Sequence, residues 1–107
     1  MSDDLIPCTR GWTALVVPLS TVKLLHVVGE IRLATTNEVP RLCLADPQSD
    51  DPAVLSLEVE ISTRGPGALG PFWCAVGYSV PLHERLPTSV RITWAGIEVG
   101  RAAVVEE

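Results

Sequence analysis

The alternation of apolar and polar positions predicts a chain built from short β-strands. The clearest example is the segment from Ala53 to Thr63, in which every second residue is large and apolar. The apolar set consists of Leu55, Leu57, Val59 and Ile61. The residues between them are serines and glutamates, which is the pattern of an antiparallel strand with one buried face and one solvated face. A slip of one residue would bury two glutamates, so this penalty determines which face lies inside.

Four further segments are rich in β-branched and aromatic residues and end at proline, glycine or a polar turn. Strands are therefore predicted over residues 11–17, 22–34, 39–45 and 72–80. The second segment also fits a helical spacing in part. Its many β-branched residues and its internal Gly29 favour a strand, with a bulge or bend expected at that glycine.

The C-terminal residues 88–105 predict a β-hairpin around a two-residue Ala95-Gly96 turn, and a longer loop with a bulge is the alternative. Its expected cross-strand pairs are Trp94 with Ile97, Ile92 with Val99, Val90 with Arg101 and Thr93 with Glu98. Because the first two pairs bring apolar residues together, this register buries Trp94 in the core.

About seven short strands without a convincing helix indicate an all-β fold. We expect an antiparallel β-sandwich, and the alternative is a small closed β-barrel. The length of 107 residues suits a single domain. Residues 1–10 are expected to form a flexible, solvated N-terminal tail, and residues 11–107 the single β domain.

The loop from Arg64 to Pro71 is dense in glycine and proline and is predicted to be exposed. In the strand that follows, the large residues from Phe72 to Val80 occupy even positions. Trp73 is the exception, because it falls among small residues on the opposite face. An exposed tryptophan beside such a loop is typical of an interface anchor, and packing within the monomer is the alternative.

Composition excludes several classes of function. A net charge of −5 with a single lysine argues against nucleic-acid binding, which depends on neutralising phosphates. Every apolar run is shorter than a membrane-spanning helix requires, so no membrane partner is predicted. Three widely spaced cysteines, without a CxxC pair or an export signal, predict reduced thiols in a cytoplasmic protein. A bridge between Cys43 and Cys74 is the alternative.

Few residues are candidates for catalysis or metal binding. His26 and Glu30 share one face of a strand but stand about 13 Å apart, too far to act as an acid–base pair. The loop His83-Glu84-Arg85 holds three functional groups without an orienting partner. The acidic loop 46–52 lacks the spacing of a calcium-binding EF-hand. We therefore predict no catalytic residue, no metal site and no cofactor.

Two functional hypotheses follow from the sequence. The first is a non-catalytic module that binds another protein or itself, using an edge strand and the loop from Gly65 to Trp73. The second is a small β-barrel that binds an apolar small molecule, and acts on it if it is an enzyme, with Trp12, Trp73, Tyr78 and His26 lining the cavity. The predicted binding residues are Trp73, Phe72, Leu69, Arg64, Trp12, His83 and Arg85.

Overall fold

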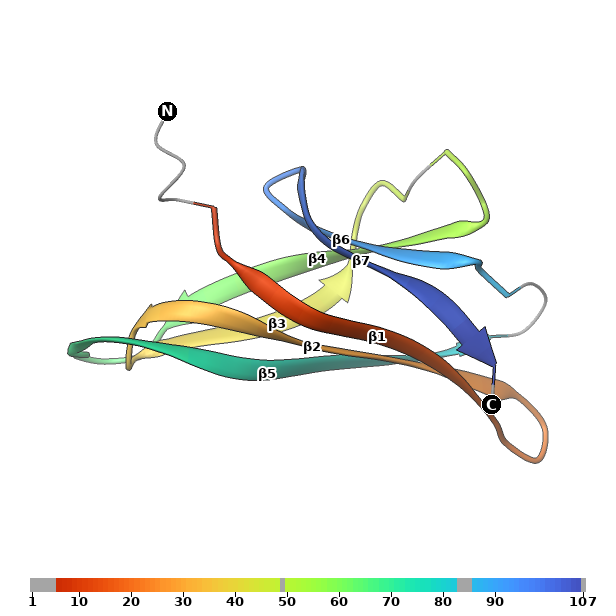
Figure 1. Cartoon of the computed structure of the whole chain (residues 1–107), viewed down its shortest axis with the longest axis horizontal. Helices are drawn as coiled ribbons and strands as arrows, with labels where there is room; N and C mark the ends of the chain where they lie inside the picture. The colour runs from red at the N-terminus through yellow and green to blue at the C-terminus, as the bar shows by residue number, and fades with distance from the viewer. Residues whose placement is uncertain (1–5, 49, 83–85, 107) are drawn as a thin grey trace.

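The computed structural model describes residues 6–48, 50–82 and 86–106, and within these ranges every regular element is a β-strand (Figure 1). The strands are β1 (Thr9–Pro18), β2 (Lys23–Thr35), β3 (Glu38–Leu44), β4 (Val54–Thr63), β5 (Leu69–Leu82), β6 (Ser89–Trp94) and β7 (Ile97–Glu106). The predicted all-β fold is thereby confirmed.

The seven strands form one continuous sheet in the order β3-β4-β6-β7-β1-β2-β5. The sheet folds over on itself into a flattened sandwich that is nearly closed into a barrel, with β3 and β5 at its two ends (Figure 1). Two of its pairings, β1 with β7 and β4 with β6, are parallel, so the sheet is mixed. Because parallel partners lie far apart in the chain, no local sequence pattern predicts their pairing.

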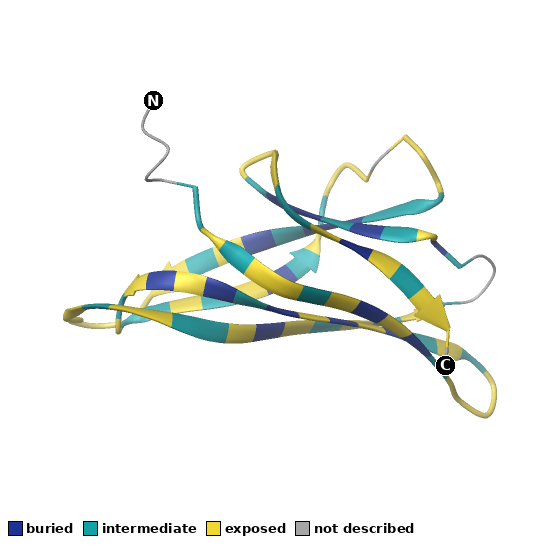
Figure 2. Ribbon diagram, viewed as in Figure 1, coloured by how far each residue is buried: buried dark blue, intermediate teal, exposed yellow. Residues whose placement is uncertain are grey.

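The core lies between the two layers and follows the predicted alternation. On β4, Leu57 and Val59 are buried, and on β2 the odd-numbered residues Leu25, Val27 and Ile31 are fully enclosed. Figure 2 shows the resulting alternation of buried and exposed positions along β2. These side chains and those of β6 make one contiguous apolar core.

The predicted irregularity at Gly29 lies in the neighbouring strand instead. Strand β2 is unbroken, whereas in β1 the two residues Gly11 and Trp12 stand opposite the single Gly29. Gly11 has a φ of 69°, the left-handed conformation found at the first position of a glycine-type β-bulge. The bulge turns the indole of Trp12 into the sandwich, where it packs against the core.

The predicted C-terminal hairpin forms, but its register is only partly as expected. Ala95 and Gly96 both have positive φ, as a two-residue type I′ turn requires, and the pairs Trp94–Ile97 and Thr93–Glu98 are present. Beyond them, Val99 is an extra residue in β7. Ile92 therefore pairs with Gly100 rather than with Val99, and Val90 pairs with Ala102 rather than with Arg101.

The boundary expected between tail and domain also shifts. Strand β1 begins at Thr9, and the backbone N–H of Arg32 donates a 2.9 Å hydrogen bond to the carbonyl of Cys8. Residues 8–10 therefore belong to the sheet, since their backbone groups find partners on β2. Strand β5 is likewise longer than the predicted segment 72–80 and extends from Leu69 to Leu82.

Candidate functional site

The outer edge of β5 is one of the two borders of the sheet that the structure describes. In the sheet order β5 is a terminal strand, and its backbone pairs with β2 alone. Figure 1 shows β3 and β5 starting at the same end of the molecule and then diverging, and among the described strands only β2 pairs with β5. We call this side of β5 the open edge.

Pro81 identifies which residues of β5 point their backbone groups to the open edge. Pro81 pairs with Leu24 of β2, but it has no N–H to donate to that strand. Prolines in sheets therefore sit where the backbone points away from the partner strand. Pro71 lies at an irregularity of the strand, where Gly70 and Pro71 stand opposite the single Ala34 of β2, so Pro81 alone fixes the parity. The odd residues between the two prolines, Trp73, Ala75, Gly77 and Ser79, accordingly direct their N–H and C=O groups to the open edge.

The segment between these prolines, Phe72 to Val80, contains no charged residue. Natural edge strands are usually protected by lysine, proline, bulges or covering segments, because an unpaired edge is a template for another strand. Here proline protects only the two ends. The uncharged centre is left as a surface on which a further strand could pair.

The core-facing side of β5 is also incompletely covered. Of its even-numbered residues only Val76 is buried, while Cys74, Tyr78 and Val80 are half-buried and Phe72 is 37% exposed. The corresponding residues of β2 are almost completely enclosed. The difference arises because β2 has a strand on each side, whereas β5 has one.

Trp73 lies on the outer face of β5, as its parity predicts, but it is held there by a neighbour. The guanidinium carbon of Arg10 lies 3.8 Å from the centre of the Trp73 ring, which is cation–π geometry. Arg10 also donates a 3.0 Å hydrogen bond to Glu30. Three strands thus contribute one residue each to a cluster that fixes the tryptophan in a half-buried position.

The loop before β5 is anchored rather than free. The Nδ2 of Asn37 donates to the carbonyl of Gly65 at 2.7 Å, and the N–H of Arg64 donates to the carbonyl of Asn37. A Cβ at Gly67 would overlap with the side chain of Asn37, so only glycine fits there. The exposed side chain at the end of this loop is Leu69, with 90% of its surface accessible.

The remaining predicted binding residues do not join this edge. Arg64 is exposed in the loop, and Trp12 points into the sandwich, where its Nε1 donates to Thr9 at 2.9 Å. His83 and Arg85 lie outside the described residues. Of the four residues expected to line a barrel cavity, Trp12 and Tyr78 pack against the core, whereas His26 and Trp73 lie on the outer face.

His26 has a hydrogen-bond partner on the neighbouring strand that the sequence alone did not identify. Its Nδ1 lies 2.6 Å from the hydroxyl oxygen of Ser79, directly opposite on β5. Both side chains stand on the exposed outer face. A serine–histidine pair is half of a nucleophilic site, but among the described residues no third group hydrogen-bonds to the imidazole, and the pair lies on an open sheet surface.

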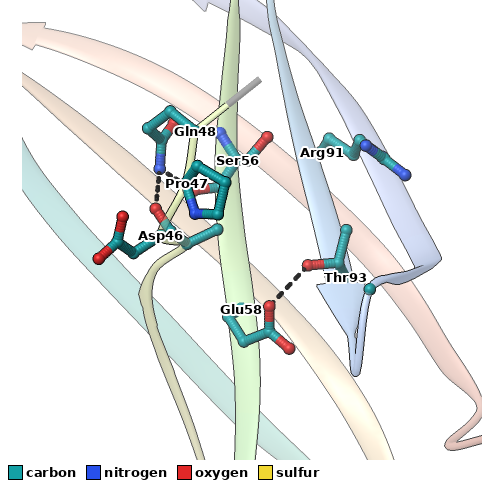
Figure 3. Close-up of a pocket in the computed structure, with 9 residues that line it drawn as sticks. Asp46, Pro47, Gln48, Ser56, Glu58, Arg91 and Thr93 are labelled. Carbon is teal, nitrogen blue, oxygen red and sulfur yellow. Dashed lines mark hydrogen bonds between the residues drawn. The ribbon is translucent and has the colours of Figure 1, made fainter. Parts of the chain in front are cut away.

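A shallow polar pocket of about 310 Å³ lies on the opposite layer, between the loop after β3 and the β6–β7 hairpin (Figure 3). The side-chain amide of Gln48 organises it, because Nε2 donates to the carbonyls of Ala45 and Ser56 while Oε1 accepts from the N–H of Ser56. Glu58 accepts hydrogen bonds from the Thr93 hydroxyl and from the backbone of Ala95. The polar groups of the pocket are therefore largely engaged in holding the loop to the sheet.

The cysteines are free thiols in the structure, so the Cys43–Cys74 bridge does not form. A hydrogen bond to Glu60, together with burial and the charge of that carboxylate, raises the pKa of Cys43. Hydrogen bonds from Cys43 and Arg41 in turn lower the pKa of Glu60. A thiol with a raised pKa is a poor nucleophile at neutral pH. Within the described ranges, no three metal-ligating side chains cluster together.

An apolar pocket of about 380 Å³ lies at the end of the sandwich beside Trp94. Leu33, Ile61 and Pro7 contribute its other apolar walls, and Glu38 and Arg32 also line it. It opens to solvent at the surface, and the buried side chains between the two layers form one contiguous apolar core.

Comparison of the chain with protein-family models, with curated proteins and with solved structures found no match. The described part of the chain also contains no helix of the length and apolar character that would cross a membrane.

Proposed function

We propose that this protein is a non-catalytic assembly module that binds a β-strand along the open edge of β5. The observation that carries the proposal is the uncharged edge segment between Pro71 and Pro81, whose odd-numbered residues present unpaired backbone groups. Strand addition satisfies such groups with main-chain hydrogen bonds and uses side-chain contacts for specificity.

The side chains around the edge support this proposal. An added strand would cover Cys74, Tyr78 and Val80, which are half-buried in the monomer. On the outer face the residues Ala75, Gly77 and Ser79 are small, so they leave the approach of another backbone unobstructed. Leu69 and Phe72 stand exposed at the start of the same strand and would extend the contact.

The test is a proline placed on the open edge. Gly77→Pro removes an N–H that points away from β2, so it should leave the sheet intact while blocking an incoming strand. Gly77→Ala is the matched control, because it keeps the N–H and its Cβ would meet only ordinary contacts, the nearest at 3.4 Å. Sedimentation velocity over a concentration series measures self-association. Anisotropy of a labelled, lysine-tagged peptide of residues 70–82 measures strand capture.

We expect the wild-type protein and Gly77→Ala to associate or to capture the peptide, and Gly77→Pro to do neither while keeping its thermal midpoint. Self-association tests pairing between intact copies, and peptide capture tests pairing of the edge with an isolated strand. A wild-type chain that remains monomeric and captures no peptide would show that the proposal is wrong.

A further inference from the structure

We infer that the strand bound at the open edge is β5 of a second copy of this chain, paired antiparallel about a two-fold axis at Val76. This inference rests on the proposed function and adds the identity of the partner and the register. It is argued from the positions of the two prolines and from the side chains that the two-fold axis would bring together.

Pairing two open edges requires outward-facing residues to stand opposite one another. An axis at Val76 places Trp73 opposite Ser79 of the second copy and Ala75 opposite Gly77 of the second copy. The symmetry repeats both pairs, so all four outward residues of each strand take part. Each such pair exchanges two N–H···O=C bonds, giving about eight in total.

The prolines close this register at both ends. With the axis at Val76, Pro71 stands opposite Pro81 of the second copy, and neither position has an N–H to leave unpaired. Moving the axis by one residue, to Gly77 or to Ala75, places a proline opposite Trp73 or Ser79 respectively. The carbonyl of Trp73 or of Ser79 then has no N–H opposite it in either copy. The register centred on Val76 instead pairs every N–H and C=O of the four outward-facing residues.

The side chains are self-complementary in the same register. On the outer face the large ring of Trp73 lies beside the small Ser79, and Ala75 beside Gly77. On the inner face Val76 meets its own symmetry mate, Cys74 meets Tyr78, and Phe72 meets Val80. Every inner pair is apolar or aromatic, and no charge of this acidic chain is brought opposite a like charge. An isologous two-fold contact requires this kind of self-complementarity.

A single cysteine on the axis tests the register. Val76→Cys is made in a chain carrying Cys8→Ser, Cys43→Ser and Cys74→Ser. Residues opposite one another in a pair without ladder hydrogen bonds have Cα atoms about 4.5 Å apart, within the range of a disulfide. Oxidation with diamide should therefore yield a disulfide-linked dimer on a non-reducing gel. Ser79→Cys in the same background is the matched control, since it faces Trp73 and should remain largely uncrosslinked.

A second cysteine variant tests the same register in case Val76→Cys does not fold. Tyr78→Cys in a chain that keeps Cys74, with Cys8→Ser and Cys43→Ser, places the new thiol opposite Cys74 of the second copy. Within one chain these positions are about 13 Å apart along the strand, too far for an internal bridge. The inference is supported if either variant forms more disulfide-linked dimer than the Ser79→Cys control.

The inference is wrong if neither variant forms a disulfide-linked dimer, or if the Ser79→Cys control forms as much of it. If Gly77→Pro still abolishes association or peptide capture in that case, the edge binds a strand in another register or from another protein, and the proposed function stands. If Gly77→Pro has no effect on either, the proposed function fails as well.

Discussion

The indole of Trp12 lies directly against the backbone of Gly100. A Cβ at Gly100 would overlap with Nε1 and Cδ1 of the indole, and a Cβ at Gly29 would overlap with its six-membered ring. Trp12 thus fits between a glycine of β2 and a glycine of β7. The bulges in β1 and β7 occur beside this ring, which links strands that are distant in the sequence.

Gly100→Ala should therefore destabilise the fold. Overfilling a packed site forces side chains and backbone to shift, at a cost of about 1–3 kcal/mol in the free energy of unfolding. Urea denaturation followed by circular dichroism measures this change. Gly70→Ala is the matched control, because the nearest atom to a Cβ there is 3.9 Å away.

A double-mutant cycle with Trp12→Ala distinguishes the specific overlap from a general preference for glycine. In the Trp12→Ala background the ring is gone, so Gly100→Ala should cost little further stability. An unchanged cost in both backgrounds would contradict the close packing of this pair.

Gln48 provides a second prediction. Its Nε2 donates to two carbonyl oxygens at 2.7 and 2.8 Å, so Gln48→Glu would place a carboxylate against them. We expect a loss of about 1 kcal/mol at pH 7, because an acceptor replaces a donor. The folded protein should raise the pKa of the new carboxyl, since only its protonated form can donate. Stability relative to wild type should then recover as the pH falls through that pKa, as thermal unfolding at several pH values would show.

Gln48→Met is the control for this pH dependence. It removes the same hydrogen bonds and introduces no titratable group, so its difference from wild type should stay constant with pH. A Gln48→Glu variant that follows the Gln48→Met variant at every pH would contradict the role assigned to Nε2.

Glu98 should contribute a pH-dependent part of the stability. A hydrogen bond from Arg101, helped by the charges of Arg101 and Arg91, lowers the pKa of Glu98 below its ordinary value of 4.5. A carboxyl whose pKa is lowered by folding stabilises the native state above its unfolded pKa and loses this effect as the pH falls through the folded one. The thermal midpoint of Glu98→Gln should therefore lie below that of wild type at pH 7, and the gap should narrow below about pH 4.5.

The same gap should shrink in high salt, because Glu98 and both arginines are substantially exposed and their interaction is screened. A gap that is independent of pH would instead indicate that the substitution acts through packing.

Much of the fold could be predicted from local pattern. The alternation of Leu57 and Val59 with glutamates identified the inner face of β4, and the positive φ values at Ala95 and Gly96 confirm the predicted turn. Such features depend on neighbouring residues along one strand. The extra residue Val99 was missed because a bulge depends on what the strand packs against, and here that neighbour includes Trp12.

For the candidate site, the sequence pointed to Trp73 and the loop before it, and the tertiary structure adds the open edge of β5. The parity of Trp73 predicted its position on the outer face. The cation–π contact that Arg10 makes with its ring depends instead on the pairing of β1, β2 and β5, which the sequence did not show. The loop at Gly65 is exposed as predicted, but its hydrogen bond to Asn37 could not be predicted, because it joins residues that are 28 positions apart in the sequence.

By itself, the sequence of this protein determined the strands, their buried faces and the uncharged stretch between Pro71 and Pro81, because these properties follow from residue type and a two-residue period. The tertiary structure alone decided that this stretch lies at the border of the sheet rather than at its centre. That position depends on strand order, and strand order is set by which inner faces together enclose the core. The loop beside this stretch is held in place by Asn37, and the open backbone edge of β5 lies next to it.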